Sequence, residues 1–490
     1  MQLQENKLTN LKFNLLLNVA RVSSTALIII FTMPYLNRVL GAENIGKVEY
    51  IYTIINYFVI FSCLGIPMYG IRETSKVRHN PDKLYTLVFE LLIILGATTL
   101  ISYLFIFGII IHLEHFKTYK NLLYIFSFMV FLNNIGAEWY FQGIEDQKFI
   151  TIRNLVVRII ALILIFTIIK SNHDYEKYAI LLVIMFFGAN LINFFLLTYH
   201  ILEQKIKWKS LNFRRHYKPV LTIFIATVSV NIYVQLDKFL IGNIVGNKAV
   251  AYYTLAYNLL KFGILFLTAI SSVMLPRLSY FYLNDKEQYF QFLKKIFDGI
   301  LLISIPLTIF FLIFAKNIIS LMGGSEFAPA ILSLRILSPL CILFSIAYFF
   351  GFMVLYPQGE EKIYSLATAL TAFVSVILNI FAIKYFDIYG ASAVAIFSEF
   401  LAILFMYFLT KKNIPEVILD SNTRKIILIN LLIFVILFLV INIFNVSLIL
   451  WIISIVLSIF FYLLLLFFFN EETTIKTVQF LKTKFSKVED

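Results

Sequence analysis

Residues 84–111 read LYTLVFELLIILGATTLISYLFIFGIII, and Glu90 is the one acidic or basic side chain in this run. A helix needs about 20 mostly apolar residues to cross the hydrocarbon core of a bilayer. The run is therefore long enough to span a membrane, and comparable runs follow one another along the chain. We expect an all-α integral membrane protein.

The composition indicates the same fold class. Of the 490 residues, 60% are hydrophobic and 14% are charged, whereas soluble domains typically have about 45–50% and 25%. One soluble core cannot bury so much apolar surface, so lipid must cover the rest. The net charge of +13 does not indicate a nucleic-acid partner. The basic residues lie in short loops between apolar runs, where they determine topology.

We predict about 14 transmembrane helices, and Asp387 and Gly390 separate the eleventh from the twelfth. The predicted spans are residues 13–36, 48–70, 84–111, 119–141, 151–170, 177–201, 217–243, 249–275, 292–315, 331–356, 362–384, 388–410, 424–445 and 447–469. Lysine and arginine favour one set of loops by roughly three to one. By the positive-inside rule, both termini are therefore expected on the cytoplasmic side of a multi-pass cell-membrane protein.

A weak internal repeat indicates two halves. Leu40–Ile45 follows the first span and Val245–Val250 follows the seventh, with Gly41 and Gly246 in register. Transporters are often built from such repeats. The predicted domains are a six-helix bundle at 1–210, a second at 211–412, transmembrane helices 13 and 14 at 413–470, and a cytoplasmic tail at 471–490.

Several charged residues fall inside predicted spans. Arg21, Lys261 and Glu399 lie deep, and Arg158 lies about two turns into the fifth span. The adjacent Asp237 and Lys238 lie toward the outer end of the seventh span. Each such group costs about 2.5–3.5 kcal/mol on insertion scales, so each requires a reason.

One reason is a cationic cavity that binds a phosphate, for which guanidinium and ammonium groups supply the donors. Arg21, Lys261, Arg158 and Lys238 are the candidate substrate-binding residues. Glu399 and Asp237 are candidates for ion coupling or charge pairing.

Other interpretations stay open for some of these residues. Arg153 and Arg158 can reach the inner surface by snorkelling, and Asp237 and Lys238 can form an interface pair. A further group of acids lies within a turn or two of the inner face, where we expect it to be hydrated. This group is Glu90, Glu138 and Asp298.

The sequence also lacks several motifs. It has no G-x-x-x-x-G-K-[ST] phosphate loop, so we expect no ATP hydrolysis on this chain. The histidines show no metal-ligand spacing, and Cys63 and Cys341 both lie in apolar segments. We therefore expect neither a metal nor a cofactor. A membrane enzyme, such as a polysaccharide polymerase or glycosyltransferase, is the alternative to a transporter. The outer loops are too short for the catalytic domain of such an enzyme.

Three stretches carry a family resemblance. They are Glu138–Glu145 (EWYFQGIE), Asp237–Gly242 (DKFLIG) with Pro276–Ser279 (PRLS), and Leu378–Ile380 (LNI) with Tyr389–Ala393 (YGASA). In their order and spacing they resemble the Wzx-type flippases of polysaccharide biosynthesis. Those proteins belong to the superfamily of multidrug, oligosaccharidyl-lipid and polysaccharide exporters.

The resemblance implies two six-helix bundles around a central cavity, with two further C-terminal helices. It implies movement of undecaprenyl-diphosphate-linked oligosaccharide units to the outer leaflet for O-antigen, capsule or exopolysaccharide. A polysaccharide polymerase and chain-length machinery are the partners it implies. The family's usual pair in the seventh span is Asp-Arg, and Asp237-Lys238 departs from it.

The lipid II flippases of peptidoglycan synthesis remain the alternative, since they also have 14 helices and a basic cavity. The Trp139–Glu145 stretch and the single deep arginine in the first span favour the polysaccharide branch. The drug/cation antiporters of the superfamily usually have 12 spans and an acidic cavity, which the basic residues of this chain argue against.

Overall fold

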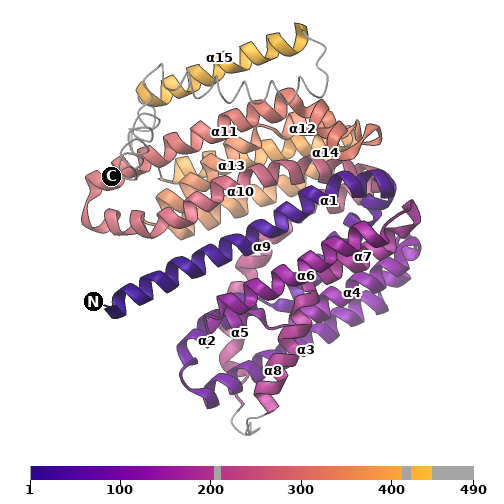
Figure 1. The fold of residues 1–490 in the computed structure, drawn as a ribbon, viewed down its shortest axis with the longest axis vertical. Coiled ribbons are helices and arrows are strands. Elements are labelled where there is room, and N and C mark those ends of the chain that lie inside the picture. Colours follow the sequence, from indigo (N-terminus) through magenta and orange to yellow (C-terminus); the bar gives the residue numbers. More distant parts are fainter. Residues whose placement is uncertain (1, 203–210, 411–420, 444–490) are drawn as a thin grey trace, which may run out of the picture. The chain divides into compact units, whose positions relative to one another are not determined.

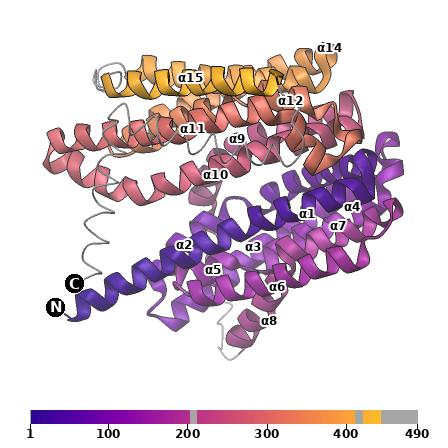
Figure 2. The same ribbon diagram turned by 45° about the horizontal axis from the view of Figure 1, so that its top comes forward.

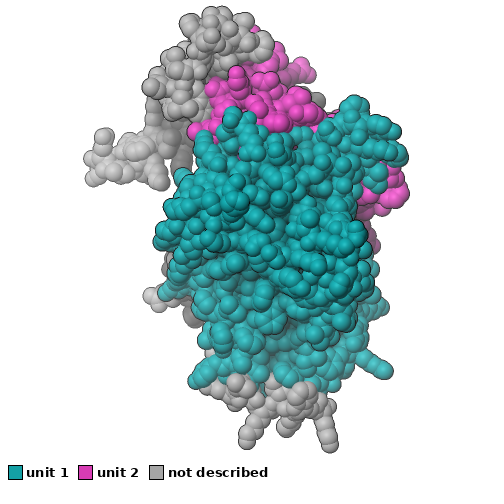
Figure 3. All heavy atoms as spheres, turned by 90° about the vertical axis from the view of Figure 1, so that its right-hand side faces the viewer, with its two compact units in different colours: residues 1–254, 322–326, 379–388 teal, residues 255–321, 327–378, 389–490 magenta. Residues whose placement is uncertain are grey.

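A computed structural model describes residues 2–202, 211–410 and 421–443, and every element in these ranges is helical (Figure 1). The chain forms two compact units (Figure 3). The first unit holds residues 1–254 with 322–326 and 379–388. The second holds residues 255–321 and 327–378 and the chain from residue 389 onward.

The first unit begins with α1 (Gln2–Cys63), which contains the first predicted span and most of the second, joined at a kink. Gly41 makes the kink with φ 74° and ψ 167°, a backbone conformation that glycine adopts without steric cost. The other elements of the unit are α2 (Ile66–Val77), α3 (Pro81–Gly108), η1 (Ile110–His112), η2 (Glu114–Tyr119), α4 (Lys120–Ile135), α5 (Glu138–Gly143), α6 (Gln147–Ile168), η3 (Asn172–Asp174), α7 (Tyr175–Val183), the π-helical η4 (Ile184–Gly188), α8 (Ala189–Leu202) and α9 (Arg214–Ile244).

The helix α10 (Asn247–Asn284) begins in the first unit and continues into the second. It is followed by α11 (Lys286–Gly323), η6 (Ser325–Phe327), α12 (Ala330–Leu337), α13 (Leu340–Tyr348), the π-helical η7 (Phe349–Leu355), α14 (Glu361–Thr410) and α15 (Ser421–Ile443). As predicted, α14 contains two spans, and its backbone breaks at Asp387 with φ 50°.

The expectation of an all-helical, multi-pass chain is confirmed. Among the described residues, eight helices are long and apolar enough to cross a membrane. The predicted spans 217–243 and 249–275 coincide with α9 and α10. The last predicted span, 447–469, and the predicted tail lie outside the described residues.

Two buried acids hold the starts of later helices, and we call these contacts the acid clamps. In the first unit, Glu90 of α3 is fully buried. Its carboxylate accepts from the Asn212 backbone N–H at 2.5 Å and contacts Arg215 and, at 2.8 Å, the Nε2 of His216. These partners lie at the start of α9, so the clamp fixes that end of α9 to α3.

In the second unit, Asp298 of α11 is 4% exposed and accepts from Asn422 Nδ2 at 2.9 Å and Thr423 Oγ1 at 2.8 Å. Lys294 pairs with the same carboxylate at 2.7 Å. The clamp holds the start of α15, whose Ile429 packs against Ile309 of α11. Figures 1 and 2 both show α15 running alongside α11.

The clamps reveal an internal repeat. Asp298 follows Glu90 by 208 residues, and Asn422 follows Asn212 by 210. The local sequences agree, with Phe before each acid and Asn-x-Arg-[Arg/Lys] at each helix start. Gly41 and Gly246, which the sequence placed in register, both have positive φ. The repeat therefore matches α11 with α3 and α15 with α9. The expectation that Glu90 and Asp298 are hydrated was wrong, because both carboxylates are enclosed by the helix starts that they bind.

Glycines allow close approach at the turn between the two spans of α1. A Cβ at Gly46 would lie 1.8 Å from the backbone oxygen of Asn247, and one at Gly242 would lie 2.1 Å from the ring of Tyr50. The Tyr50 hydroxyl also donates to Asn243 Oδ1 at 3.1 Å. The turn of α1 therefore packs directly on the end of α9 and the start of α10.

Glu90→Gln and Asp298→Asn should each destabilise the protein by about 2 kcal/mol, because each leaves buried donors without a charged acceptor. Thermal unfolding in detergent, followed by tryptophan fluorescence, measures this effect. The matched control is Glu114→Gln, whose side chain is 90% exposed in its pair with Lys117. Equal melting temperatures for all four proteins would contradict the clamps.

Gly46→Ala should lower the melting temperature, because its methyl group has no space beside the Asn247 carbonyl. Gly96→Ala is the control, since a Cβ there meets nothing within 4 Å. Alanine at that helical position should be neutral or slightly stabilising. Wild-type behaviour of Gly46→Ala would show that the two backbones do not approach closely.

Candidate functional site

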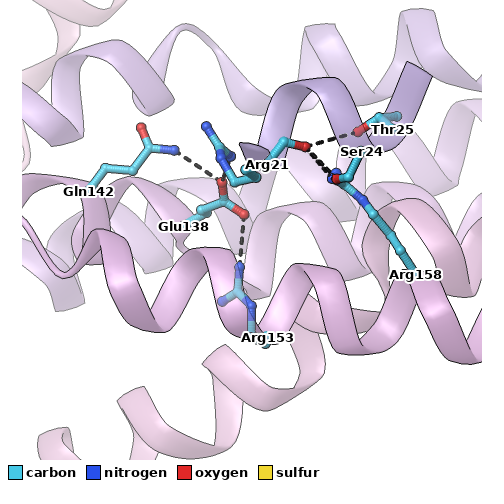
Figure 4. A network of polar contacts seen from close by, with 7 residues as sticks. All are labelled: Arg21, Ser24, Thr25, Glu138, Gln142, Arg153 and Arg158. Carbon is cyan, nitrogen blue, oxygen red and sulfur yellow. Dashed lines mark hydrogen bonds and ion pairs between the residues drawn. The ribbon is translucent and has the colours of Figure 1, made fainter. Parts of the chain in front are cut away.

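The site lies within the first unit, where α1, α5 and α6 bring charged side chains together (Figure 4). Arg21 comes from α1, Glu138 and Gln142 come from α5, and Arg153 and Arg158 come from α6. We call this group the arginine cluster.

The short helix α5 is positioned by its aromatic residues. After α4 ends, Ala137 adopts φ 41°, and the chain turns into α5. Trp139, Tyr140 and Phe141 are at most 4% exposed. Gly70 of α2 makes room for the Trp139 ring, because a Cβ there would lie 2.5 Å from it. This packing fixes Glu138, the first residue of α5.

Glu138 bridges two arginines from different helices. Its Oε1 lies 2.7 Å from Arg21 Nη1, and its Oε2 lies 3.0 Å from Arg153 Nη2. Gln142 Nε2, one turn along α5, donates to the same Oε1 at 3.1 Å. Charge-assisted hydrogen bonds of this kind are short and strong. The expectation that Glu138 is hydrated at the inner face stays a prediction, since 27% of its side chain is exposed.

Arg153 is the most enclosed member, with 2% of its side chain exposed. Its guanidinium also lies over the Phe149 ring, 5.5 Å from the centroid. Neither Nε nor Nη1 has a hydrogen-bond partner in the part of the protein that the structure describes. The alternative in which Arg153 snorkels to the inner surface is wrong, because its charge points at Glu138 instead.

Arg158 supports the turn of α1 that carries Arg21. Its Nη1 donates to the Arg21 carbonyl at 2.6 Å and to Ser24 Oγ at 2.8 Å. The Ser24 hydroxyl in turn donates to the same carbonyl at 2.8 Å. Arg158 therefore also points inward to α1, and it does not snorkel.

The cluster has an excess of positive charge. Among the described residues, Arg21 and Arg153 share the carboxylate of Glu138, and the third guanidinium group, that of Arg158, binds the Arg21 carbonyl and Ser24. Guanidinium is always charged and matches the oxygen spacing of carboxylates and phosphates. Opposite charges attract far more strongly in a low-dielectric environment than in water. The arrangement can therefore bind an anionic group and offers it donors from two helices.

The predicted residues Arg21 and Arg158 thus meet, whereas Asp237 and Lys238 lie in a different network. Asp237 accepts from the Tyr253 hydroxyl at 2.6 Å and from Asn379 Nδ2 at 2.9 Å. Lys238 pairs with Glu49 of α1 at 2.9 Å. The two neighbours therefore bind separate partners.

Lys261 and Glu399 belong to the second unit. Lys261 lies on α10 with an exposed side chain, and Glu399 lies half-buried on α14. Their predicted roles in substrate binding and ion coupling remain predictions.

Glu138 and Arg153 were not predicted from the sequence as members of the site. The signal that was available is the glutamate at the start of the EWYFQG stretch, followed by two arginines five residues apart on the next helix.

Two family models match long parts of the chain. The model described as "Polysaccharide biosynthesis protein" matches residues 12–281, and the model of the lipid II flippase MurJ matches residues 149–471. The first of these covers α1, α5 and α6 and therefore the whole arginine cluster.

Curated relatives and solved structures agree with these matches. An Escherichia coli K12 protein named for O-antigen transport is 22% identical over 83% of this chain and 98% of its own length. The capsular polysaccharide biosynthesis protein CapF of Staphylococcus aureus is 23% identical over 76% of this chain and 91% of its own.

Two solved structures share the fold. MurJ in its inward closed conformation has a TM-score of 0.70 at 17% identity and covers 92% of this chain and 99% of its own. An inward-facing multidrug MATE transporter has a TM-score of 0.61 at 15% identity and covers 80% of this chain and 97% of its own. Since the first family model matches more than half of the chain, this multi-pass membrane protein belongs to the polysaccharide biosynthesis protein family, as its resemblance to the Wzx-type flippases implied.

Proposed function

We propose that this chain is a flippase that moves undecaprenyl-diphosphate-linked oligosaccharide repeat units from the cytoplasmic to the outer leaflet. The observation that carries the proposal is the arginine cluster, in which two guanidinium groups pair with one carboxylate and a third binds the Arg21 backbone carbonyl. A site of this charge suits a substrate with several negative charges.

The physical problem of the reaction is the head group. A diphosphate with attached sugars cannot enter hydrocarbon unaided, because burying an unpaired charge is very costly. Guanidinium donors replace the water that the phosphate oxygens lose. The polyprenyl tail is apolar and can stay in the lipid throughout. The protein therefore has to provide a polar path for the head group alone.

In this proposal Arg21 contacts the diphosphate, and Arg158 holds the α1 turn that carries Arg21. Lys261 and Lys238 are proposed as further cations along the path. Asp237, whose hydrogen bonds come from neutral groups, and Glu399 are proposed for ion coupling or charge pairing.

The cargo is inferred from the relatives. The E. coli and S. aureus proteins are named for O-antigen transport and capsular polysaccharide biosynthesis. The likeness to MurJ consists of a family-model match over residues 149–471 and a shared fold at 17% identity. The names of the two curated relatives therefore favour polysaccharide repeat units over the alternative cargo, lipid II. A membrane enzyme such as a polymerase or glycosyltransferase has no support from these relatives.

The proposed topology has about 14 transmembrane helices in two six-helix bundles, 1–210 and 211–412, followed by helices 13 and 14 in 413–470 and a tail at 471–490. Both termini would lie in the cytoplasm, and in a cell with two membranes the protein would lie in the inner one. The proposed partners are a polysaccharide polymerase and the chain-length machinery.

Complementation tests the function. Bacteria that lack their own flippase but assemble the matching lipid-linked unit should recover surface polymer when this chain is expressed. Arg21→Ala and Lys261→Ala should abolish or strongly reduce the recovery at equal membrane levels, because each removes a cation that binds the head group. Surface polymer is measured by immunoblotting of intact cells.

Lys117→Ala is the matched control, because this exposed lysine pairs only locally with Glu114; it should behave as wild type. Full activity of Arg21→Ala would show that the arginine cluster does not bind the head group. Failure of the wild-type chain, with the unit accumulating on the cytoplasmic side, would favour another cargo such as lipid II.

A further inference from the structure

The position of Glu138 between two arginines is the starting point. One carboxylate oxygen binds Arg21 on α1 and the other binds Arg153 on α6. The two arginines are thus held together by an anion that the protein itself provides. A phosphate also presents oxygens that can bind two guanidinium groups at once.

The cluster has more donors than Glu138 can satisfy. Arg153 is 2% exposed at its side chain, yet its Nε and Nη1 have no partner within the described residues. The Nε of Arg158 is in the same situation. Buried donors are normally satisfied, and each that is not costs free energy. These nitrogens therefore indicate a ligand with more acceptor oxygens than a carboxylate has.

Gln142 gives Glu138 a third partner. Its Nε2 lies 3.1 Å from Oε1, on the same helix as Glu138 and one turn away. If another anion takes over the two arginines, the carboxylate can keep this hydrogen bond. Gln142 can therefore still donate to the Glu138 carboxylate after the carboxylate leaves the guanidinium groups.

We infer that Glu138 stands in for a phosphate of the substrate in the empty protein, and that the bound phosphate replaces it as the anion bridging Arg21 and Arg153. This inference rests on the proposed function and adds Arg153 and Glu138 to its site. Arg153 binds the phosphate, and Glu138 competes with it.

The exchange has a consequence for the transport cycle. Leaving a buried charge without a partner is strongly destabilising. With Glu138 in place, Arg21 and Arg153 both keep an anionic partner when the substrate is absent, so the protein can return to its starting conformation. The competing carboxylate also weakens substrate binding and so favours release of the substrate.

Binding of farnesyl diphosphate to the purified full-length protein in detergent tests the exchange, with farnesol as the uncharged probe. Glu138→Gln should bind farnesyl diphosphate roughly tenfold more tightly than wild type, because the competing charge is gone. Arg153→Gln should bind it roughly tenfold more weakly. In complementation, Glu138→Gln should recover less surface polymer than wild type despite its tighter binding.

Two further variants separate competition from a merely structural role. Glu138→Asp keeps the charge and should bind like wild type. Glu145 lies on the turn after α5, with an exposed side chain that pairs with Arg78. Glu145→Gln should also bind like wild type. Gel filtration and melting temperature check that each variant is folded. Farnesol binding should be the same in all of them.

Unchanged or weaker binding by folded Glu138→Gln, or unchanged binding by Arg153→Gln, would overturn the inference. If Arg21→Ala still abolished complementation, the proposed function would stand without it. If the wild-type protein bound no diphosphate and Arg21→Ala complemented fully, both the inference and the proposed function would fall.

Discussion

The structure depends on the requirement that an ionised group removed from water has a charged or hydrogen-bonding partner. In hydrocarbon this requirement is severe, because no water is available to solvate the group. Glu138 meets it with Arg21 and Arg153, Glu90 meets it with the start of α9, and Asp298 meets it with the start of α15. In each case an acid on one helix determines where another helix lies.

The three acids meet the requirement in two different ways. At Glu90 and Asp298, backbone or neutral side-chain donors join the basic groups, so the carboxylate is enclosed and well satisfied. At Glu138 the basic groups exceed the acid, and some of their donors have no partner among the residues that the structure describes. The first arrangement fixes helices in place, whereas the second leaves positive charge for a ligand. The same pairing rule therefore gives structural contacts at one place and a binding site at another.

The acid clamps also explain the construction of the chain. The same acid and the same helix start recur after about two hundred residues, together with the positive-φ glycines Gly41 and Gly246. A duplicated half would carry its helix-docking contacts with it. By this argument α15 is more than a terminal addition, because it occupies in its unit the position that α9 occupies in the other.

Much of the site was within reach of the sequence, but its pairing was not. Arg21 and Arg158 were recognisable because a cation deep in an apolar span is expensive. Snorkelling of Arg153 to the surface stayed open, because spacing along a helix gives depth in the membrane and says little about the neighbouring helix. Asp237 and Lys238 were open to interpretation as a pair, although neighbours on a helix do not face each other. Their separate partners, Tyr253 and Glu49, follow from that geometry.

The sequence by itself determined that the chain is helical and spans a membrane, because 60% hydrophobic residues arranged in long runs have no other stable solution. It also determined which charges lie inside the spans. Only the tertiary structure decided which charges meet. Glu138 lies 117 residues from Arg21 and 15 from Arg153, and hydrophobic periodicity carries no information about contacts between helices so far apart. The break at Ala137 and the packing of Trp139 against Gly70 bring the carboxylate to both arginines.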